Sequence, residues 1–278
     1  METMETMKTM KTMKIFLIFI IFITFGCNEI KTDVQNKTSD VQNKMSNSSL
    51  YQQAMEIAMY PTESKVYKNL TQIIPENKDL IRKKIDGENY ILVATWGPWT
   101  QKTGPVSMDT FFETYKDSTY FNSGDPNFNP IWVTVAPELL KRIKKEKYEN
   151  ADLRLAQLFG MPPNTKGKYF VEFWVKPGDL FRPCPDNEIT DRQCDVCLSK
   201  KTDSSYVAWI NNQRINSYYQ CDLNNEYPWT QLGYTFDWNP ENKSNIGLSE
   251  FVVRKNSNMV VNAVYTTEEY LNKDINTK

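Results

Sequence analysis

An apolar run over residues 15–25 divides this chain into a leader and a part that can fold. Lys14 precedes the run, which at about 1.5 Å per helical residue spans roughly 16 Å, half the hydrocarbon core of a bilayer. A run this short is typical of a signal peptide and too short for a membrane span. We therefore expect residues 1–26 to be a signal peptide, with the repetitive residues 1–12 preceding the true start of translation.

Gly26 and Cys27 directly follow the apolar run. A small residue before a Cys at this place resembles the bacterial lipobox, in which the Cys thiol receives diacylglycerol and the Cys becomes the new N-terminus. Thr24 and Phe25 depart from the residues usual there. We expect Cys27 to carry the lipid, with fatty acyl chains such as palmitate, and to attach the protein to a membrane. The alternative is an ordinary signal peptide followed by a Cys with no special role.

The segment after the lipidated Cys contains few apolar side chains and repeats DVQNK at 33–37 and 40–44. Such a segment cannot bury enough surface to order itself, so residues 27–48 are predicted to be a disordered tether before a single globular domain, 49–278. This layout is typical of a lipoprotein of the cell envelope. The Lys-, Asn- and Ile-rich composition is similar to that of Bacteroidota, which would make the anchoring membrane a Gram-negative one. We expect the outer membrane rather than the inner one.

The composition excludes several kinds of chemistry. The 278 residues include 33 Lys+Arg against 34 Asp+Glu, and a net charge of −1 argues against nucleic acid as a partner. The chain has no His, which rules out Ser-His-Asp and Cys-His nucleophile pairs, HExxH zinc sites and two-His-one-carboxylate iron sites. Any catalysis would use carboxylates, Lys, Tyr, Ser or Cys, and no cofactor is predicted.

Helix-like and strand-like segments alternate through the domain without a Gly/Ser-rich break. Apolar periodicity predicts helices at 50–60, 137–147, 151–159 and 206–215, and a final turn at 268–271 capped by Thr267. It predicts strands at 89–96, 131–136, 168–176, 232–238, 248–254 and 259–265. Several links between strands are too short for a crossover helix, so we expect an α+β domain with a mixed or largely antiparallel sheet and flanking helices.

The strand at 168–176 places Glu172 between Phe170 and Trp174 on one face. Burial between aromatic rings would raise the pKa of this carboxyl toward the range useful for acid–base chemistry. The alternative is a half-exposed face with Glu172 paired to a Lys or Arg of a neighbouring strand.

The segment 227–238, YPWTQLGYTFDW, is rich in aromatic residues and carries Asp237 and Trp238. Aromatic faces with carboxylates are typical of sugar-binding grooves, although a core strand has the same pattern. We hypothesise that Glu172, Trp174, Asp237 and Trp238 border one site for a glycan, or for a peptide. Hydrolysis of a glycan would need two carboxylates about 5–10 Å apart, with Glu250 as a third candidate. A structural or protein-interaction domain is the remaining alternative.

Four further cysteines follow the spacing C-x9-C-x2-C-x23-C: Cys184, Cys194, Cys197 and Cys221. Export to an oxidising compartment favours disulfides over a zinc site or a redox CxxC, and three pairings are open. Four acidic residues accompany them, Asp186, Glu188, Asp191 and Asp195. They are predicted to form a solvated loop, because the spacing lacks the glycine and the last Glu of an EF-hand calcium loop, and no metal is predicted.

Three motifs carry a resemblance to a known family: FVEFWVKPGDLFRPCPDNEITDRQC at 170–194, YPWTQLGYTFDW at 227–238 and GLSEFVV at 247–253. Over roughly residues 50–270 the chain resembles a family of uncharacterised bacterial proteins. The resemblance implies no activity, cofactor or catalytic residue. It implies a Cys184–Cys194 disulfide, because that family has counterparts of both residues, and it leaves Cys197 to pair with Cys221.

Overall fold

The computed structural model describes residues 46–97, 100–101, 104–105, 121–122, 131–219 and 227–274. The chain divides into two units, Met1–Ser49 and Leu50–Lys278, and the second contains every described strand. The predicted signal peptide, Cys27 and most of the predicted tether lie outside the described residues. No helix in the described part of the chain is both long and apolar enough to span a bilayer.

The order of elements follows the predicted alternation. The first described helix covers residues 46–58. The other helical segments are the 3-10 turns η1 (Glu63–Lys65) and η2 (Pro177–Asp179), the helices α3 (Ala136–Ile143), α4 (Ala151–Leu158), α5 (Ser204–Gln213) and α6 (Thr267–Asn272), and the π-helical turn η3 (Arg214–Tyr218). The strands are β1 (Arg82–Ile85), β2 (Glu88–Gly97), β3 (Thr100–Gln101), β4 (Gly104–Pro105), β5 (Phe121–Asn122), β6 (Trp132–Val135), β7 (Tyr169–Val175), β8 (Leu180–Phe181), β9 (Tyr234–Phe236), β10 (Ile246–Ser249), β11 (Phe251–Val253) and β12 (Asn258–Thr266).

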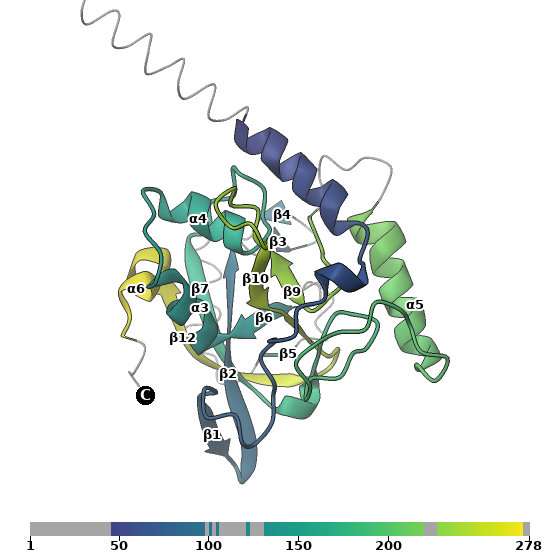
Figure 1. Cartoon of the computed structure of the whole chain (residues 1–278). Coiled ribbons are helices and arrows are strands. Elements are labelled where there is room, and N and C mark those ends of the chain that lie inside the picture. The colour runs from purple at the N-terminus through teal and green to yellow at the C-terminus, as the bar shows by residue number, and fades with distance from the viewer. Residues whose placement is uncertain are drawn as a thin grey trace, which may run out of the picture. The chain divides into compact units, whose positions relative to one another are not determined.

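The domain is built on one sheet with the strand order β5-β12-β7-β2-β6-β11-β8, and β1 pairs with β2 beside that path (Figure 1). Two short ladders, β9–β10 and β3–β4, stand apart from it. Every pairing among these strands is antiparallel. The predicted α+β class with a largely antiparallel sheet is therefore confirmed.

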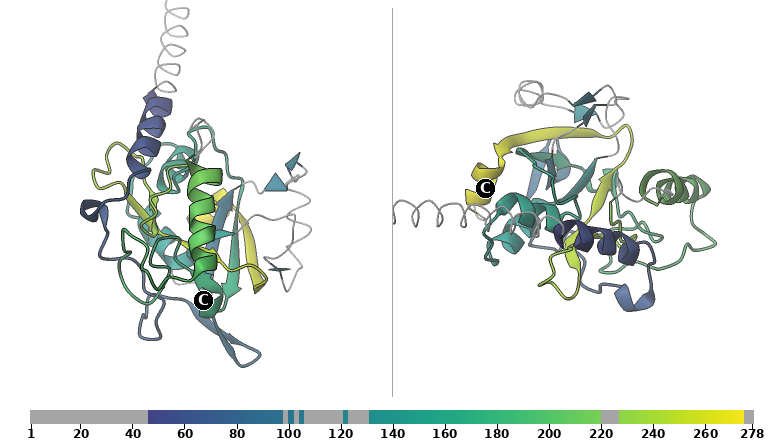
Figure 2. Two further views of the ribbon diagram at one scale, coloured as in Figure 1. Left: turned by 90° about the vertical axis from the view of Figure 1, so that its right-hand side faces the viewer. Right: turned by 90° about the horizontal axis from the view of Figure 1, so that it is seen from above.

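Strand β7 shows why the sheet is buried on both sides. Val171, Phe173 and Val175 face one apolar cluster, to which the segment before β1 adds Ile73. Phe170 and Trp174 face a second cluster, filled by apolar side chains of α3, α4 and α6. Figure 2 shows α5 away from α6, and its apolar side chains Tyr206 and Ile210 pack against β8 and β11 at one end of the strand order.

Three local predictions differ from the structure. The predicted strand 248–254 is two strands, because the chain leaves β9 after Ser249 and joins β6 and β8 from Phe251 onward. The predicted strand 232–238 shortens to β9. The cap of α6 is Thr266 instead of Thr267, since Thr266 and Glu269 form a reciprocal capping box.

The sequence predicted β2 but not strand β1 or the hairpin turn that joins the two. Asp86 and Gly87 form its turn with φ angles of 50° and 83°, and an Asp-Gly pair is the sequence signal for a two-residue hairpin turn.

Candidate ligand-binding site

Glu172 and Trp174 lie together on β7 and share one partner. The Glu172 carboxylate accepts hydrogen bonds from Lys273 Nζ at 2.7 Å and Asn262 Nδ2 at 2.9 Å, and the side chain is fully buried. Trp174 Nε1 donates to Asn262 Oδ1 at 2.9 Å. Glu172 therefore has an ion-pair partner, supplied by the residue after α6 instead of a neighbouring strand.

Asp237 and Trp238 lie in a different set of contacts. Arg154 of α4 binds both Asp237 oxygens, at 2.9 and 2.8 Å, and Asn242 Nδ2 donates to Asp237 Oδ2 at 2.8 Å. Trp238 Nε1 donates to the carbonyl of Met161 at 2.9 Å. These contacts join the β9 end to α4.

The four residues predicted to border one ligand site thus fall into two pairs that share no described partner. All four side chains are buried, with Trp174 the most exposed at 7 %. Trp238 also lines a small hollow of about 190 Å³ beside Leu50 and Asn242. The described contacts give the four residues structural roles, and a ligand-binding role for them stays a prediction.

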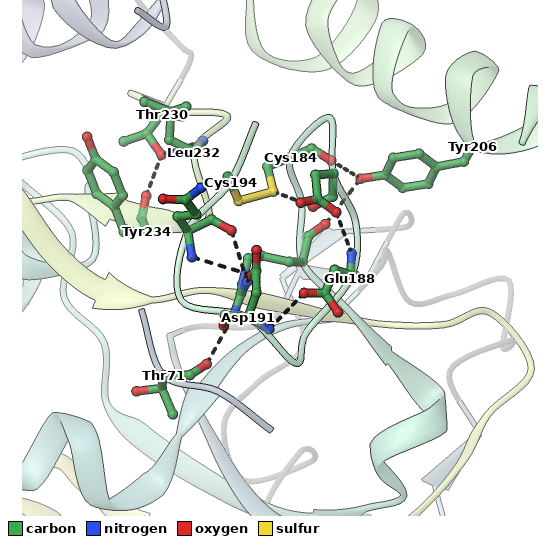
Figure 3. Close-up of a disulfide and its surroundings, with 12 residues drawn as sticks. Thr71, Cys184, Glu188, Asp191, Cys194, Tyr206, Thr230, Leu232 and Tyr234 are labelled. Atoms are coloured by element: carbon green, nitrogen blue, oxygen red, sulfur yellow. Dashed lines mark hydrogen bonds and ion pairs between the residues drawn. A yellow bond between two sulfur atoms is a disulfide. The ribbon is translucent and has the colours of Figure 1, made fainter. Parts of the chain in front are cut away.

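The predicted disulfide Cys184–Cys194 is present (Figure 3). The loop that it closes folds around the guanidinium of Arg182, which is fully buried and donates to Asp191 Oδ1 at 2.7 Å. Asp191 N in turn donates to Glu188 Oε1 at 2.7 Å. The acidic loop therefore supplies the ion-pair partner of the buried Arg182, through Asp191. The described residues contain no group of three or more acidic or cysteine side chains placed to hold a metal ion.

The second predicted disulfide, between Cys197 and Cys221, differs from the structure at Cys197. Its thiol is free and exposed, so the pairing of Cys197 with Cys221 is not formed. Cys221 itself lies outside the described residues. Spacing along the chain limits the possible pairings, but it does not report the distance between two thiols in the fold.

A cavity of about 240 Å³ lies at the junction of the main sheet and the β9–β10 ladder. Its described lining is mostly aromatic or apolar and comes from β2, β6, the end of α4, η3, β9 and the break between β10 and β11: Thr95, Trp96, Trp132, Val133, Thr134, Phe159, Gly160, Met161, Tyr218, Tyr227, Pro228, Trp229, Tyr234, Thr235, Phe236 and Glu250.

Glu250 is the one carboxyl group in this described lining. The residue sits where the chain passes from β10 to β11, and its backbone N–H donates to the carbonyl of Gly233 at 2.9 Å. Its Oε2 atom is buried and has no hydrogen-bond partner in the described part of the chain. Burial without a compensating partner raises the pKa of Glu250 to about 8.

Two other residues of the cavity wall also carry a buried polar atom without a hydrogen-bond partner. Thr134 Oγ1 on β6 and Trp229 Nε1 are buried without a hydrogen-bond partner, and with Glu250 Oε2 they make three of the five such atoms found among the described residues. Each unsatisfied buried group costs about 1–3 kcal/mol. All three atoms belong to residues of the cavity wall.

Three rings gather on one side of the cavity. The indoles of Trp132 and Trp229 are nearly perpendicular, at 82° with centroids 6.0 Å apart, and Tyr218 lies 5.6 Å from Trp132 and 5.1 Å from Trp229. Tyr218 belongs to η3, and π-helical turns are frequently found at functional sites.

Hydrogen bonds and close packing hold the segment 229–235 at the cavity wall. Thr230 Oγ1 donates to the carbonyl of Tyr234 at 2.6 Å, and Tyr219 Oη donates to the carbonyl of Trp229. Gly233 has φ of 76°, and a Cβ there would lie 2.7 Å from Cys194 Sγ. Figure 3 shows Thr230, Leu232 and Tyr234 beside Cys194. The disulfide therefore supports the turn whose Gly233 carbonyl positions Glu250.

Comparison with models of protein families, with curated proteins and with solved structures finds no match to this chain. The resemblance suggested by the three motifs stays a prediction.

Sequence reasoning named Glu250 but missed the residues around it. A usable signal was present in the strand at 131–136, where a period of two places Trp132 and Thr134 on one face. No comparable pattern indicates η3, because Tyr218 reaches the cavity from a π-helical turn.

Proposed function

We propose that this protein is lipid-anchored in the cell envelope and binds a small ligand through its globular domain. The ligand site is the cavity lined by Glu250, Trp132 and Trp229, called the Glu250 cavity below. The observation that carries the proposal is the concentration of unpartnered polar atoms, Glu250 Oε2, Thr134 Oγ1 and Trp229 Nε1, in one aromatic cavity. Pockets with apolar walls and a few convergent polar groups are typical of ligand sites.

The ligand expected from the sequence is a glycan or a similar molecule, and a cavity of about 240 Å³ limits it to a small group such as one sugar unit or the end of a longer chain. A carboxylate-based hydrolase has less support, because it needs a pair of carboxylates and the described lining offers Glu250 alone.

The test uses two variants of one position. Thr134→Phe places a ring in the cavity and should abolish binding, whereas Thr134→Val keeps the shape and removes only the unpartnered hydroxyl. The full chain and both variants are screened on a glycan array and by ligand-observed NMR against neutral and charged small molecules. A parallel assay for released reducing sugar tests hydrolysis. Ligands that bind wild type and Thr134→Val but not Thr134→Phe support the proposal, and equal binding to all three proteins contradicts it.

Anchoring by Cys27 and residence in the outer membrane are part of the same proposal and rest on the leader sequence alone. The lipid would place the cavity at the membrane surface, where it meets ligands of the envelope. The fractionation experiment in the Discussion tests the anchor independently of the ligand.

A further inference from the structure

We infer that the ligand of the Glu250 cavity is a small organic cation, an alkylated ammonium group held between the Glu250 carboxylate and the faces of Trp132, Trp229 and Tyr218. This inference rests on the proposed function, because it names the chemical class of ligand for the same cavity.

The arrangement of rings fits such a cation. The indoles of Trp132 and Trp229 meet edge to face at 82° with centroids 6.0 Å apart, and the Tyr218 ring lies 5.1 Å from Trp229, so the three rings form one continuous aromatic surface. A cation is attracted to an aromatic face within about 6 Å of the ring centroid, and alkylated ammonium ions are bound by cages of such rings.

The charge of the cavity points the same way. The described lining contains no Lys or Arg, so this part of the wall offers Glu250 no counter-charge. Glu172 and Asp237, the two fully buried carboxylates among the described residues, have Lys273 and Arg154 as ion-pair partners. The Glu250 cavity therefore offers the charge that a cationic ligand would neutralise.

A neutral sugar fits the described lining less well. A desolvated sugar ring needs a partner for each of its several hydroxyl groups. Among the described lining residues, three buried polar atoms have no partner: Glu250 Oε2, Thr134 Oγ1 and Trp229 Nε1. A quaternary ammonium group presents methyl groups and has no N–H that requires a partner.

Binding should be coupled to a proton. Burial raises the pKa of Glu250 to about 8, so at pH 6.5 the carboxyl is protonated before the ligand enters. The incoming cation stabilises the carboxylate, and the proton leaves to the buffer. The described lining also contains the titratable groups Tyr218, Tyr227 and Tyr234. Tyr219, directly after η3, interacts electrostatically with Glu250 and with Arg214 of η3, and Glu138 of α3 accepts a hydrogen bond from the neighbouring Ser249 N. None of them forms an ion pair with Glu250.

Calorimetry with a matched pair of probes tests the inference. Choline chloride carries the cation, and 3,3-dimethylbutan-1-ol has the same shape without the charge. The full chain is studied in a polyoxyethylene detergent, which contains neither a sugar nor an ammonium group. Choline should bind more tightly than the alcohol and release roughly one proton at pH 6.5, measured in buffers of different ionisation enthalpy. Its Kd should be about tenfold weaker at pH 7 than at pH 9.

Two Glu→Gln variants complete the test. Glu250→Gln should weaken choline binding at pH 9 by at least about tenfold and leave the alcohol unaffected, because it removes charge and keeps shape. Glu241→Gln, an exposed position outside the cavity, changes net charge equally and should bind as wild type. If the alcohol binds as tightly as choline, or choline binds without proton release, the cation assignment is wrong while the proposed function stands. If neither probe binds, the cation assignment also fails, and the Thr134 variants decide the proposed function separately.

Discussion

Glu250→Gln should make the protein more stable, by an amount that grows with pH. The folded protein holds Glu250 at a pKa of about 8, against an ordinary value of 4.5. Below about pH 4.5 the carboxyl is protonated in both folded and unfolded chains, so protonation makes no difference there. As pH rises from 4.5 through 8, the unfolded chain ionises first and the folded state loses relative stability.

The size of the effect follows from the two pKa values. At about 1.36 kcal/mol per pKa unit, the gap between 4.5 and 8 amounts to about 5 kcal/mol when complete. The variant should therefore exceed wild type in unfolding free energy by about 1 kcal/mol at pH 5 and by about 4 kcal/mol at pH 8. Glutamine keeps the shape of the side chain and does not titrate, so the pH-dependent difference isolates the carboxyl.

Urea denaturation followed by tryptophan fluorescence at pH 5, 6, 7 and 8 measures the difference, with no ligand present. Glu241→Gln serves as the control, because that carboxylate is exposed and its replacement should leave the pH profile parallel to wild type. Parallel profiles of wild type and Glu250→Gln, within about 1 kcal/mol at every pH, would show that the carboxyl is not desolvated in the folded protein and would remove the basis for an unpaired acid.

Three further substitutions test other parts of the structure. Asp237→Ala leaves the buried Arg154 guanidinium without its main partner and should lower the unfolding free energy by about 3–5 kcal/mol in urea denaturation; a loss below about 1 kcal/mol would contradict that role. Cys194→Ser opens the disulfide over a sequence separation of 10 residues and should cost about 3 kcal/mol, and a reducing agent should then have no further effect on stability. Cys27→Ser should move the protein from the membrane fraction to the soluble one, because the predicted acylation site is gone; retention in the detergent phase, as for wild type, would refute the lipobox interpretation.

The sheet was predictable because its strands are strongly apolar and their period is clear. Strands β2, β6, β7 and β12 lie within a residue or two of their predicted positions, and alternation along β7 divides its side chains correctly between two faces. The pattern did not reveal that both faces are covered, because β7 carries Glu172 among apolar residues and its Lys273 partner lies about a hundred positions along the chain.

The candidate site was less predictable for a related reason. An aromatic residue beside a carboxylate looks the same in sequence whether it is core or cavity wall, so Trp174 and Trp238 were as plausible as Trp132 and Trp229. The distinction lies in partners: Trp174 Nε1 and Trp238 Nε1 both donate hydrogen bonds, whereas Trp229 Nε1 has no partner among the described residues. Partners across the fold are set by tertiary packing, and no local pattern encodes them.

The state of Glu250 contrasts with that of the other carboxylates held inside the domain. Glu172 and Asp237 are fully buried and ion-paired, and the partly buried Glu138 accepts hydrogen bonds from Thr71 Oγ1 and Ser249 N, each at 2.7 Å. The fold therefore provides partners for buried acids elsewhere, including one whose donor, Ser249, is the direct neighbour of Glu250. Glu250 Oε2 has no partner among the described residues, which costs stability at neutral pH, and local costs of this kind are usually retained at sites of function. The same contrast explains why a cavity, and not the more conspicuous aromatic strand β7, is the place to look for a ligand.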